Sequence, residues 1–309
     1  MTLKVVFFGT PEFAVPALSR VLESGSPVPL VVTQPDRPAG RHAVAVPSAL
    51  ARLAAVRGIP MEKPEKLALR ADLADRIRQL APDVGVVVAY GRLLPGEVLA
   101  IPRLGFVNVH ASLLPRHRGA SPVQAALLAG DRETGVVTMK VIDELDAGPL
   151  YLERRIEIGD REDAGSLSQR LSKAGADLLV ETLAGLERGT LTARPQQGVP
   201  SFCRPIRRED ARIDWTRPAA EIERRLRAYT TWPGAYTFLG KVRVKIHSFE
   251  LGPATNREPG TLWLDEDQAL VAAGEGRSLI LTGAQRAGGR LVGGSEFARG
   301  IRILPVRFS

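Results

Sequence analysis

Asn108, His110 and Ser112 are the residues whose types and spacing point most directly to chemistry. They alternate with Val107 and Val109 in the segment VNVHASLLP. Because successive side chains of a β-strand point to opposite faces, the polar residues share one face and the valines point into a core. An amide and an imidazole side by side can donate converging hydrogen bonds to a developing oxyanion. A satisfied Asn and a core His at the end of an ordinary strand would explain either residue alone, but not the whole segment with its sharp Leu-Leu-Pro turn.

A second candidate group lies in the acidic loop DELDAGP, residues 143–149, which follows a predicted strand ending at Ile142. Clustered acids before a Gly-Pro turn are most often solvated or form Asx turns, and this interpretation suffices for the loop alone. We expect strands 106–110 and 136–142 to be sheet neighbours whose carboxyl ends meet in one crevice, where α/β folds bind ligands. A carboxylate in that crevice would polarise His110 and accept a proton.

The elements that must position these groups form an alternating pattern. Helical patterns are predicted at 11–22, 48–56, 69–80 and 164–186, and strand-like apolar segments at 3–8, 28–33, 84–89, 106–110, 136–142 and 151–158. Continuous apolar strands that alternate with helices predict an α/β fold, with a Rossmann-like, mostly parallel sheet and helices on both faces. We assign this catalytic domain to residues 1–189.

The remainder of the chain has a different pattern. Residues 190–206 are rich in Pro, Gly and polar residues and are predicted to be a linker. Residues 207–309 begin with an amphipathic helix at 218–229 and continue with short strands separated by Gly-rich turns, which predicts a smaller OB-like β-barrel domain.

Composition limits the classes of protein that fit. The net charge of +8 is concentrated in residues 207–309, which carry 17 Lys and Arg against 12 Asp and Glu and therefore favour a polyanionic partner. No apolar segment is long enough for a membrane span, and no signal peptide precedes the first strand. One cysteine and four scattered histidines provide no metal site and no disulfide framework, so we expect a cytoplasmic protein without a metal. No exposed heptad pattern stands out, and we expect a monomer.

Two further loops border the same predicted crevice. The loop QPDRPAGR, which contains Arg37 and Arg41, follows the second strand, and Tyr90 and Gly91 follow the third. A surface loop is the simplest interpretation of the first of these. The turn FGTPEF after the first strand lacks the glycines of the dinucleotide-binding fingerprint, which disfavours a nicotinamide-dependent dehydrogenase.

Together, these segments resemble the methionyl-tRNA formyltransferase family. The segments FFGTPEFA, TQPDRPAGR, VVVAYG, NVHASLLPRHRGASPVQ and LDAGP occur in the family's order, as do ARIDW at 211–215 and the pair Trp232-Pro233. The resemblance spans nearly the whole chain. Its NVH-x-SLLP and LD-x-G elements are shared with glycinamide ribonucleotide and sugar N-formyltransferases, while the PDRPAGR loop and the C-terminal domain favour the tRNA enzyme.

The resemblance implies formyl transfer from 10-formyltetrahydrofolate, as cosubstrate, to the α-amine of methionyl initiator tRNA. It places the catalytic residues on Asn108, His110 and Asp146. It implies that the acceptor arm of the tRNA contacts the loop of Arg37 and Arg41, and that the basic barrel holds the tRNA from another side. The folate-contacting positions fall on Tyr90, Gly91, Ser112, Leu113, Leu114 and Pro115.

The chain departs from the family pattern at two places. After Arg41 the family continues with glycine and lysines, whereas residues 42–46 here are HAVAV, which weakens the expected contact with the acceptor arm. His117 replaces a common tryptophan. The alternatives are a formyltransferase with a small amine acceptor, which would have no evident need for residues 207–309, and an RNA-binding protein on an inactive α/β domain, which would have no reason to keep the three catalytic positions.

Overall fold

The computed structural model describes residues 2–39, 44–66 and 71–309. The chain forms two compact units, which are described separately below. The first contains Met1–Pro122, Arg132–Ile158 and Ser168–Arg204; the second contains Val123–Asp131, Gly159–Leu167 and Pro205–Ser309. Most of the segment that we predicted to be a linker, residues 190–204, therefore lies on the first unit.

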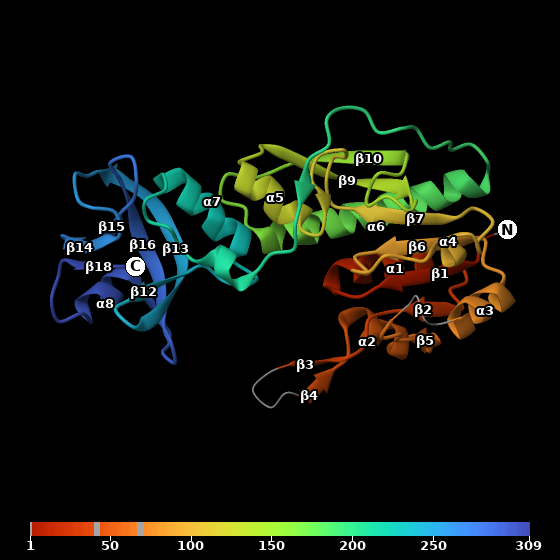
Figure 1. Ribbon diagram of the computed structural model, residues 1–309, viewed down its shortest axis with the longest axis horizontal. Helices are drawn as coiled ribbons and strands as arrows, with labels where there is room; N and C mark the ends of the chain where they lie inside the picture. The colour runs from red at the N-terminus through yellow and green to blue at the C-terminus, as the bar shows by residue number, and fades with distance from the viewer. Residues whose placement is uncertain (1, 40–43, 67–70) are drawn as a thin grey trace. The chain divides into compact units, whose positions relative to one another are not determined.

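The first unit is built on one mixed sheet, with strand order β10-β9-β7-β6-β1-β2-β5 (Figure 1). Strands β1, β2, β5, β6 and β7 are parallel, and β9 is antiparallel to both of its neighbours. The predicted mostly parallel sheet is confirmed. The strands are β1 (Val5–Gly9), β2 (Leu30–Val32), β5 (Met61–Glu62), β6 (Val84–Val88), β7 (Phe106–His110), β9 (Glu133–Lys140) and β10 (Leu150–Glu157).

Helices cover both faces of this sheet, as the sequence predicted. On one face, α3 and α4 pack on a cluster that includes Phe8, Ile77 and Phe106. On the other face, Gly175 of α6 lies so close to Val109 that a Cβ there would be 2.7 Å from its Cγ1 atom. The helices of this unit are α1 (Val15–Glu23), α2 (Ala49–Val56), α3 (Ala71–Leu80), α4 (Gly96–Leu99) and most of α6 (Ala164–Glu187).

Two small strand pairs complete the first unit. Strands β3 (Arg37–Ala39) and β4 (Val44–Val46) pair in antiparallel fashion in the loop that we predicted to contact tRNA. Strand β8 (Arg118–Gly119) pairs in parallel with β11 (Phe202–Cys203), which brings the end of the expected linker to the segment that follows β7.

The second unit is a closed antiparallel barrel, as predicted. Its strand order is β12-β13-β16-β15-β14-β18, with β17 beside β16. Reciprocal hydrogen bonds of 3.0 Å between Phe238 and Ser309 join the end of the chain to β12 and close the ring. The strands are β12 (Tyr236–Leu239), β13 (Val242–Ala254), β14 (Thr261–Asp265), β15 (Gln268–Ala272), β16 (Arg277–Arg286), β17 (Leu291–Gly293) and β18 (Val306–Arg307), and the helices include α5 (Pro122–Ala129), α7 (Ala219–Tyr229) and α8 (Gly294–Arg299).

The barrel has its own apolar core. Trp215 stacks on Phe308 with ring centroids 5.6 Å apart, and its indole Nε1 donates a 2.9 Å hydrogen bond to the hydroxyl of Thr237. Burial of this kind removes large aromatic surfaces from water while satisfying the polar edge of the indole. Across the described part of the chain, no helix has both the length and the apolar character needed to cross a bilayer.

Candidate active site

Asn108 and His110 lie on the same face of β7, as the alternation predicted. Phe106, on that face, packs against Phe8, whereas Val109 points the other way toward α6. His110 is 6% exposed and Asn108 is half-buried. Within the described residues, the Asn108 amide makes no hydrogen bond to protein, so its N–H groups are available to a substrate.

His110 lies between a carboxylate and a carbonyl. Its Nδ1 is 3.7 Å from Asp146 Oδ2, and its Nε2 is 3.1 Å from the carbonyl oxygen of His117. A carbonyl oxygen only accepts hydrogen bonds, so Nε2 is the donor and carries a proton. With that tautomer, Nδ1 carries no proton and faces the Asp146 carboxylate.

Asp146 reaches the site by a route that differs from our expectation. Because β9 is antiparallel to β7, its carboxyl end lies beside the start of β7, where Val141 N–H donates to the carbonyl oxygen of Phe106. The carboxyl ends of the two strands therefore do not meet, and that part of the prediction is wrong. The loop after β9 instead turns back toward the end of β7, where the Asp146 carboxylate accepts a 2.8 Å hydrogen bond from Gly119 N–H.

Two backbone positions support this geometry. Asp146 has φ +49°, a left-handed conformation that few residues besides Gly, Asn and Asp adopt readily. Gly119 has φ +116°, and a Cβ at this position would collide with the carbonyl oxygen of Cys203. Only glycine therefore fits between β11 and the Asp146 carboxylate.

The predicted folate segment follows directly after β7. Ser112 is fully buried, and its hydroxyl donates a 2.7 Å hydrogen bond to the carbonyl oxygen of Arg116, which closes the turn. Leu114 packs on Val137, and the bond between Leu114 and Pro115 is cis. Ser112, Leu114 and Pro115 are buried and Leu113 is half-buried, so Leu113 is the most exposed of these four residues, and their contact with folate stays a prediction.

Tyr90 and Gly91 lie at the end of the neighbouring strand β6. The Tyr90 ring is 1% exposed and packs edge-on against Phe8, with ring centroids 5.4 Å apart. Burial raises the pKa of Tyr90, and its hydroxyl has no hydrogen-bond partner among the described residues. Its carbonyl oxygen accepts a 2.7 Å hydrogen bond from Gln34, so Tyr90 also anchors the loop that leads to Arg37.

The two predicted tRNA contacts have different outcomes. Arg37 begins β3 and is exposed, with one guanidinium nitrogen 3.2 Å from Gln34 Oε1. Arg41 lies outside the described residues. A contact of either residue with tRNA stays a prediction.

Comparisons with known proteins agree with this architecture. Residues 3–183 match the family model described as formyl transferase, and residues 205–302 match that of the formyl transferase C-terminal domain. The chain is 44% identical over 310 residues to the methionyl-tRNA formyltransferase of Parvibaculum lavamentivorans, covering 98% of each protein. The chain belongs to the methionyl-tRNA formyltransferase family. It is also 43% identical over 303 residues to the family member from Thermus thermophilus, again with 98% of each covered.

The fold occurs in more distant formyltransferases. The N-formyltransferase of Helicobacter canadensis, solved in complex with folinic acid and dTDP-3-aminofucose, matches with a TM-score of 0.68 at 17% identity. The match covers 91% of this chain and 99% of that one. At this identity, the likeness concerns the fold.

Two residues of this formyltransferase that our sequence interpretation missed, Arg118 and Gln196, lie behind the candidate site. Arg118 is 9% exposed, and its guanidinium donates two hydrogen bonds to Gln196 Oε1, of 2.8 and 3.2 Å. A third guanidinium nitrogen lies 3.3 Å from Glu144. Arg118 is part of NVHASLLPRHRGASPVQ, a segment that carries the family resemblance, whereas no pattern in the expected linker indicates a role for Gln196.

Over residues 2–39, 44–66 and 71–309, no group of three or more His, Cys, Asp or Glu side chains is gathered as ligands would be. The Asn108 amide and the His110 imidazole at the end of β7 are donor types that can stabilise an oxyanion.

Proposed function

We propose that the enzyme transfers the formyl group of 10-formyltetrahydrofolate to the α-amine of methionyl initiator tRNA, which gives N-formylmethionyl-tRNA for translation initiation. Similarity over nearly the whole chain to enzymes named for this reaction supports the acceptor. The observation that carries the chemistry is the meeting of a free amide on Asn108 with the His110–Asp146 pair at the end of β7.

The reaction begins with attack of the neutral amine on the formyl carbon. A free α-amino group titrates near about 7.7–8.0, and an adjacent ester lowers that value, so no strong base is needed to deprotonate it. The attack forms a carbon–nitrogen bond and a tetrahedral oxyanion. Asn108 and protonated His110 donate hydrogen bonds to that oxygen.

Collapse of the tetrahedral intermediate breaks the bond to the folate nitrogen. The attacking nitrogen has become an ammonium and must lose a proton, while the departing folate nitrogen must gain one. Asp146 stabilises the charged imidazole and relays this proton. The products are the formylated amine and tetrahydrofolate, so atoms and charge balance without another reactant.

The folate donor has two supports. The family transfers formyl groups, and the Helicobacter relative in this fold is described with folinic acid, a formylated folate. In this chain, the turn 112–115 after β7 is the predicted folate contact, and the half-buried Leu113 is its most exposed residue.

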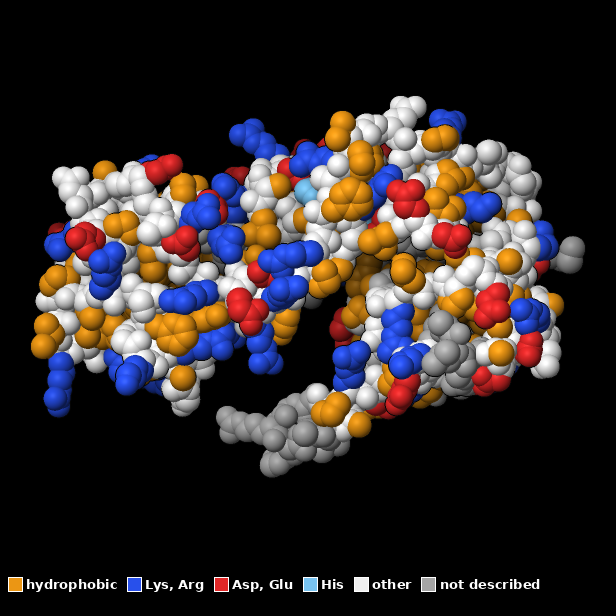
Figure 2. Space-filling model, viewed as in Figure 1, with side chains coloured by type: hydrophobic (Ala, Val, Ile, Leu, Met, Phe, Trp, Pro, Cys, Tyr) orange, Lys and Arg blue, Asp and Glu red, His pale blue; other side chains and the backbone are white. Residues whose placement is uncertain are grey.

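The second unit supports a tRNA partner. Its residues 207–309 have an excess of basic side chains, and Figure 2 shows Lys and Arg distributed over its visible face. Several arginines stack on aromatic rings; the guanidinium carbon of Arg243 lies 3.9 Å from the ring centroid of Tyr236. Exposed cations beside aromatic groups suit contacts with phosphates and bases.

The deciding experiment is single-turnover transfer of labelled formyl from 10-formyltetrahydrofolate. Methionyl initiator tRNA, methionyl elongator tRNA and glycinamide ribonucleotide are offered in parallel, together with an amino sugar nucleotide. We expect rapid transfer to the initiator species alone. Transfer only to a small amine would overturn the tRNA acceptor and leave the chemistry of the first unit unchanged.

A further inference from the structure

Gln196 connects the segment after α6 to the loop that carries Asp146. Its side-chain nitrogen Nε2 lies 2.7 Å from the carbonyl oxygen of Asp146 and 2.9 Å from that of Gly148. Its Oε1 accepts two hydrogen bonds from the buried guanidinium of Arg118. Both ends of this amide are therefore saturated by groups that lie around the candidate site.

We propose that Gln196 is a positioning residue for Asp146 and holds the carboxylate toward His110 during formyl transfer. The inference rests on the function proposed above and adds a residue that the His110–Asp146 geometry alone does not include. Gln196 acts through Asp146, because its amide nitrogen binds the backbone of the acidic loop and does not contact the side chains of Asn108 or His110.

The need for such a residue follows from the backbone of the loop. Asp146 adopts φ +49°, which is sparsely populated for residues with a Cβ and persists where the surroundings hold it. The loop also turns back from the far end of β7, since β9 is antiparallel. Hydrogen bonds to the carbonyl groups of Asp146 and Gly148 hold the chain on either side of Ala147.

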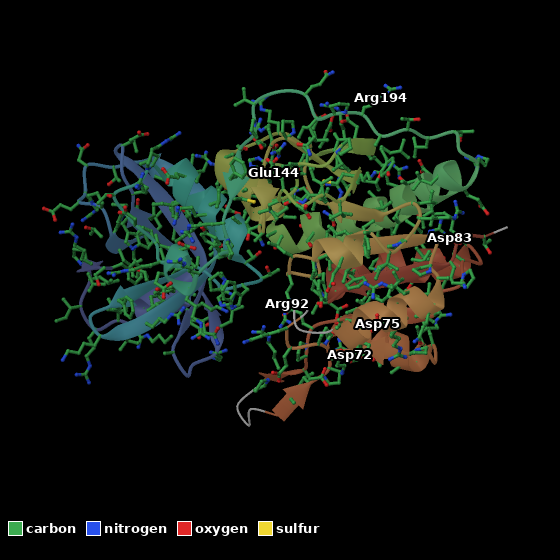
Figure 3. All side chains as sticks on the ribbon, turned by 45° about the vertical axis from the view of Figure 1, so that its right-hand side comes forward. Asp72, Asp75, Asp83, Arg92, Glu144 and Arg194 are labelled. Atoms are coloured by element: carbon green, nitrogen blue, oxygen red, sulfur yellow. The ribbon has the colours of Figure 1, made fainter. Side chains whose placement is uncertain are left out.

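Gln196 is itself held in place by its neighbours. Arg194, labelled with Glu144 in Figure 3, makes reciprocal backbone hydrogen bonds of 2.7 and 2.8 Å with Leu150, at the start of β10. Farther along, Ser201 accepts hydrogen bonds from His117 N–H through its hydroxyl and from Arg118 N–H through its carbonyl. The segment 194–203 is thus attached at both ends to elements that carry the site.

The effect of Gln196 is separable from its volume by a matched set of variants. Gln196→Ala removes both the donor and the acceptor. Gln196→Glu keeps the size and the acceptor for Arg118 but places an oxygen against the two loop carbonyls. Gln197→Ala is the control, because Gln197 is exposed and of the same type.

We expect Gln196→Ala and Gln196→Glu to lower kcat by about 10- to 100-fold, as small misplacements of reacting groups do, with the KM for folate nearly unchanged. Gln197→Ala should match the wild type. Recovery of kcat in Gln196→Glu would mean that Gln196 only fills space, and would overturn the proposal. If Gln196→Ala unfolds below the assay temperature, the kcat of Gln196→Glu alone decides the outcome.

A double-mutant cycle with Asp146→Asn tests whether the effect passes through Asp146. We expect Gln196→Glu to cause no further loss of kcat in the Asp146→Asn background, because the carboxylate that it positions is gone. A full additional loss would show an independent role and overturn the proposal.

Hydrogen exchange provides a readout that does not depend on catalysis. The Gly119 N–H donates to the Asp146 carboxylate, so its protection reports the position of that carboxylate. We expect faster exchange at Gly119 in both Gln196 variants and no change in Gln197→Ala. Unchanged protection of Gly119 N–H in the Gln196 variants would overturn the proposal, whichever molecule accepts the formyl group. If protection is lost in these variants but the wild-type enzyme does not formylate tRNA, the result counts against the proposed function only.

Discussion

The imidazole Nε2 of His110 donates a hydrogen bond to the carbonyl oxygen of His117, across 3.1 Å. This contact shows that Nε2 carries a proton in the absence of a substrate. An oxyanion accepts a stronger hydrogen bond than a neutral carbonyl, so the charged intermediate can compete with His117 for the same proton. The ring is thereby held in a donating state before the reaction begins, while its Nδ1 faces Asp146.

Asn108→Ala should reduce kcat by about 100- to 1,000-fold, the usual cost of losing one oxyanion donor. The structure adds that stability should change little, because the Asn108 amide is half-buried and makes no hydrogen bond within the described residues. Steady-state kinetics and a thermal melt of the same preparation measure both quantities. A variant with full turnover would remove Asn108 from the mechanism.

Asp146→Asn should lower turnover by about 100-fold or more while leaving folate binding close to that of the wild type. The amide can still accept the hydrogen bond from Gly119 N–H, so the loop keeps that contact but loses the charge that faces His110. Asp143→Asn, in the same loop and exposed, is the control. Equal effects on turnover and on folate affinity would show that Asp146 serves binding.

Asp83 should make the first unit more stable at neutral than at acidic pH. Asp83 lies at the opposite end of the sheet from Glu144 (Figure 3). Its carboxylate accepts hydrogen bonds from Lys4 N–H and from the guanidinium of Arg103, and these bonds lower the pKa of the carboxyl. A lowered pKa in the folded state stabilises the protein above the unfolded value and loses this effect as the pH falls through the folded value.

Asp83→Asn should therefore cost about 1 kcal/mol of unfolding free energy at pH 7 and much less at pH 3. Urea melts of the wild type and the variant at both pH values provide the comparison. A cost that is the same at pH 3 would mean that packing, and not the charge, is responsible.

Cys203 should react slowly with alkylating reagents in the folded protein. Burial raises the pKa of its thiol, which also lies 3.3 Å from the carbonyl oxygen of Arg118. Because the thiolate is the nucleophile, the rate at pH 7.5 should be below that of a free thiol and rise as the pH is increased past about 8.5. Cys203 is the one cysteine of the chain, so mass spectrometry after iodoacetamide treatment measures it directly, with urea-unfolded protein as the control.

Several features were determined by the sequence itself because they depend on local rules. The alternation in β7 placed Asn108 and His110 on one face, since the side-chain period of a strand is fixed by its backbone. Apolar runs and Gly-rich turns likewise predicted the mixed α/β unit and the barrel, which the structure confirms. The choice of Asp146 among the acids of the loop 143–149, by contrast, came from the resemblance, because one carboxylate in an acidic loop is indistinguishable from another by composition.

Tertiary structure decided how the site is assembled. The direction of β9 depends on pairing between distant segments, and it reverses the route by which Asp146 approaches His110. Gln196 lies 50 residues from Asp146 and 78 from Arg118 along the chain, in a segment with no periodic pattern. Hydrogen bonds of this kind form only after the chain has folded, because loop closure and sheet pairing bring their partners together. Local rules therefore determined which face carries the chemistry, and long-range contacts decided what holds it in place.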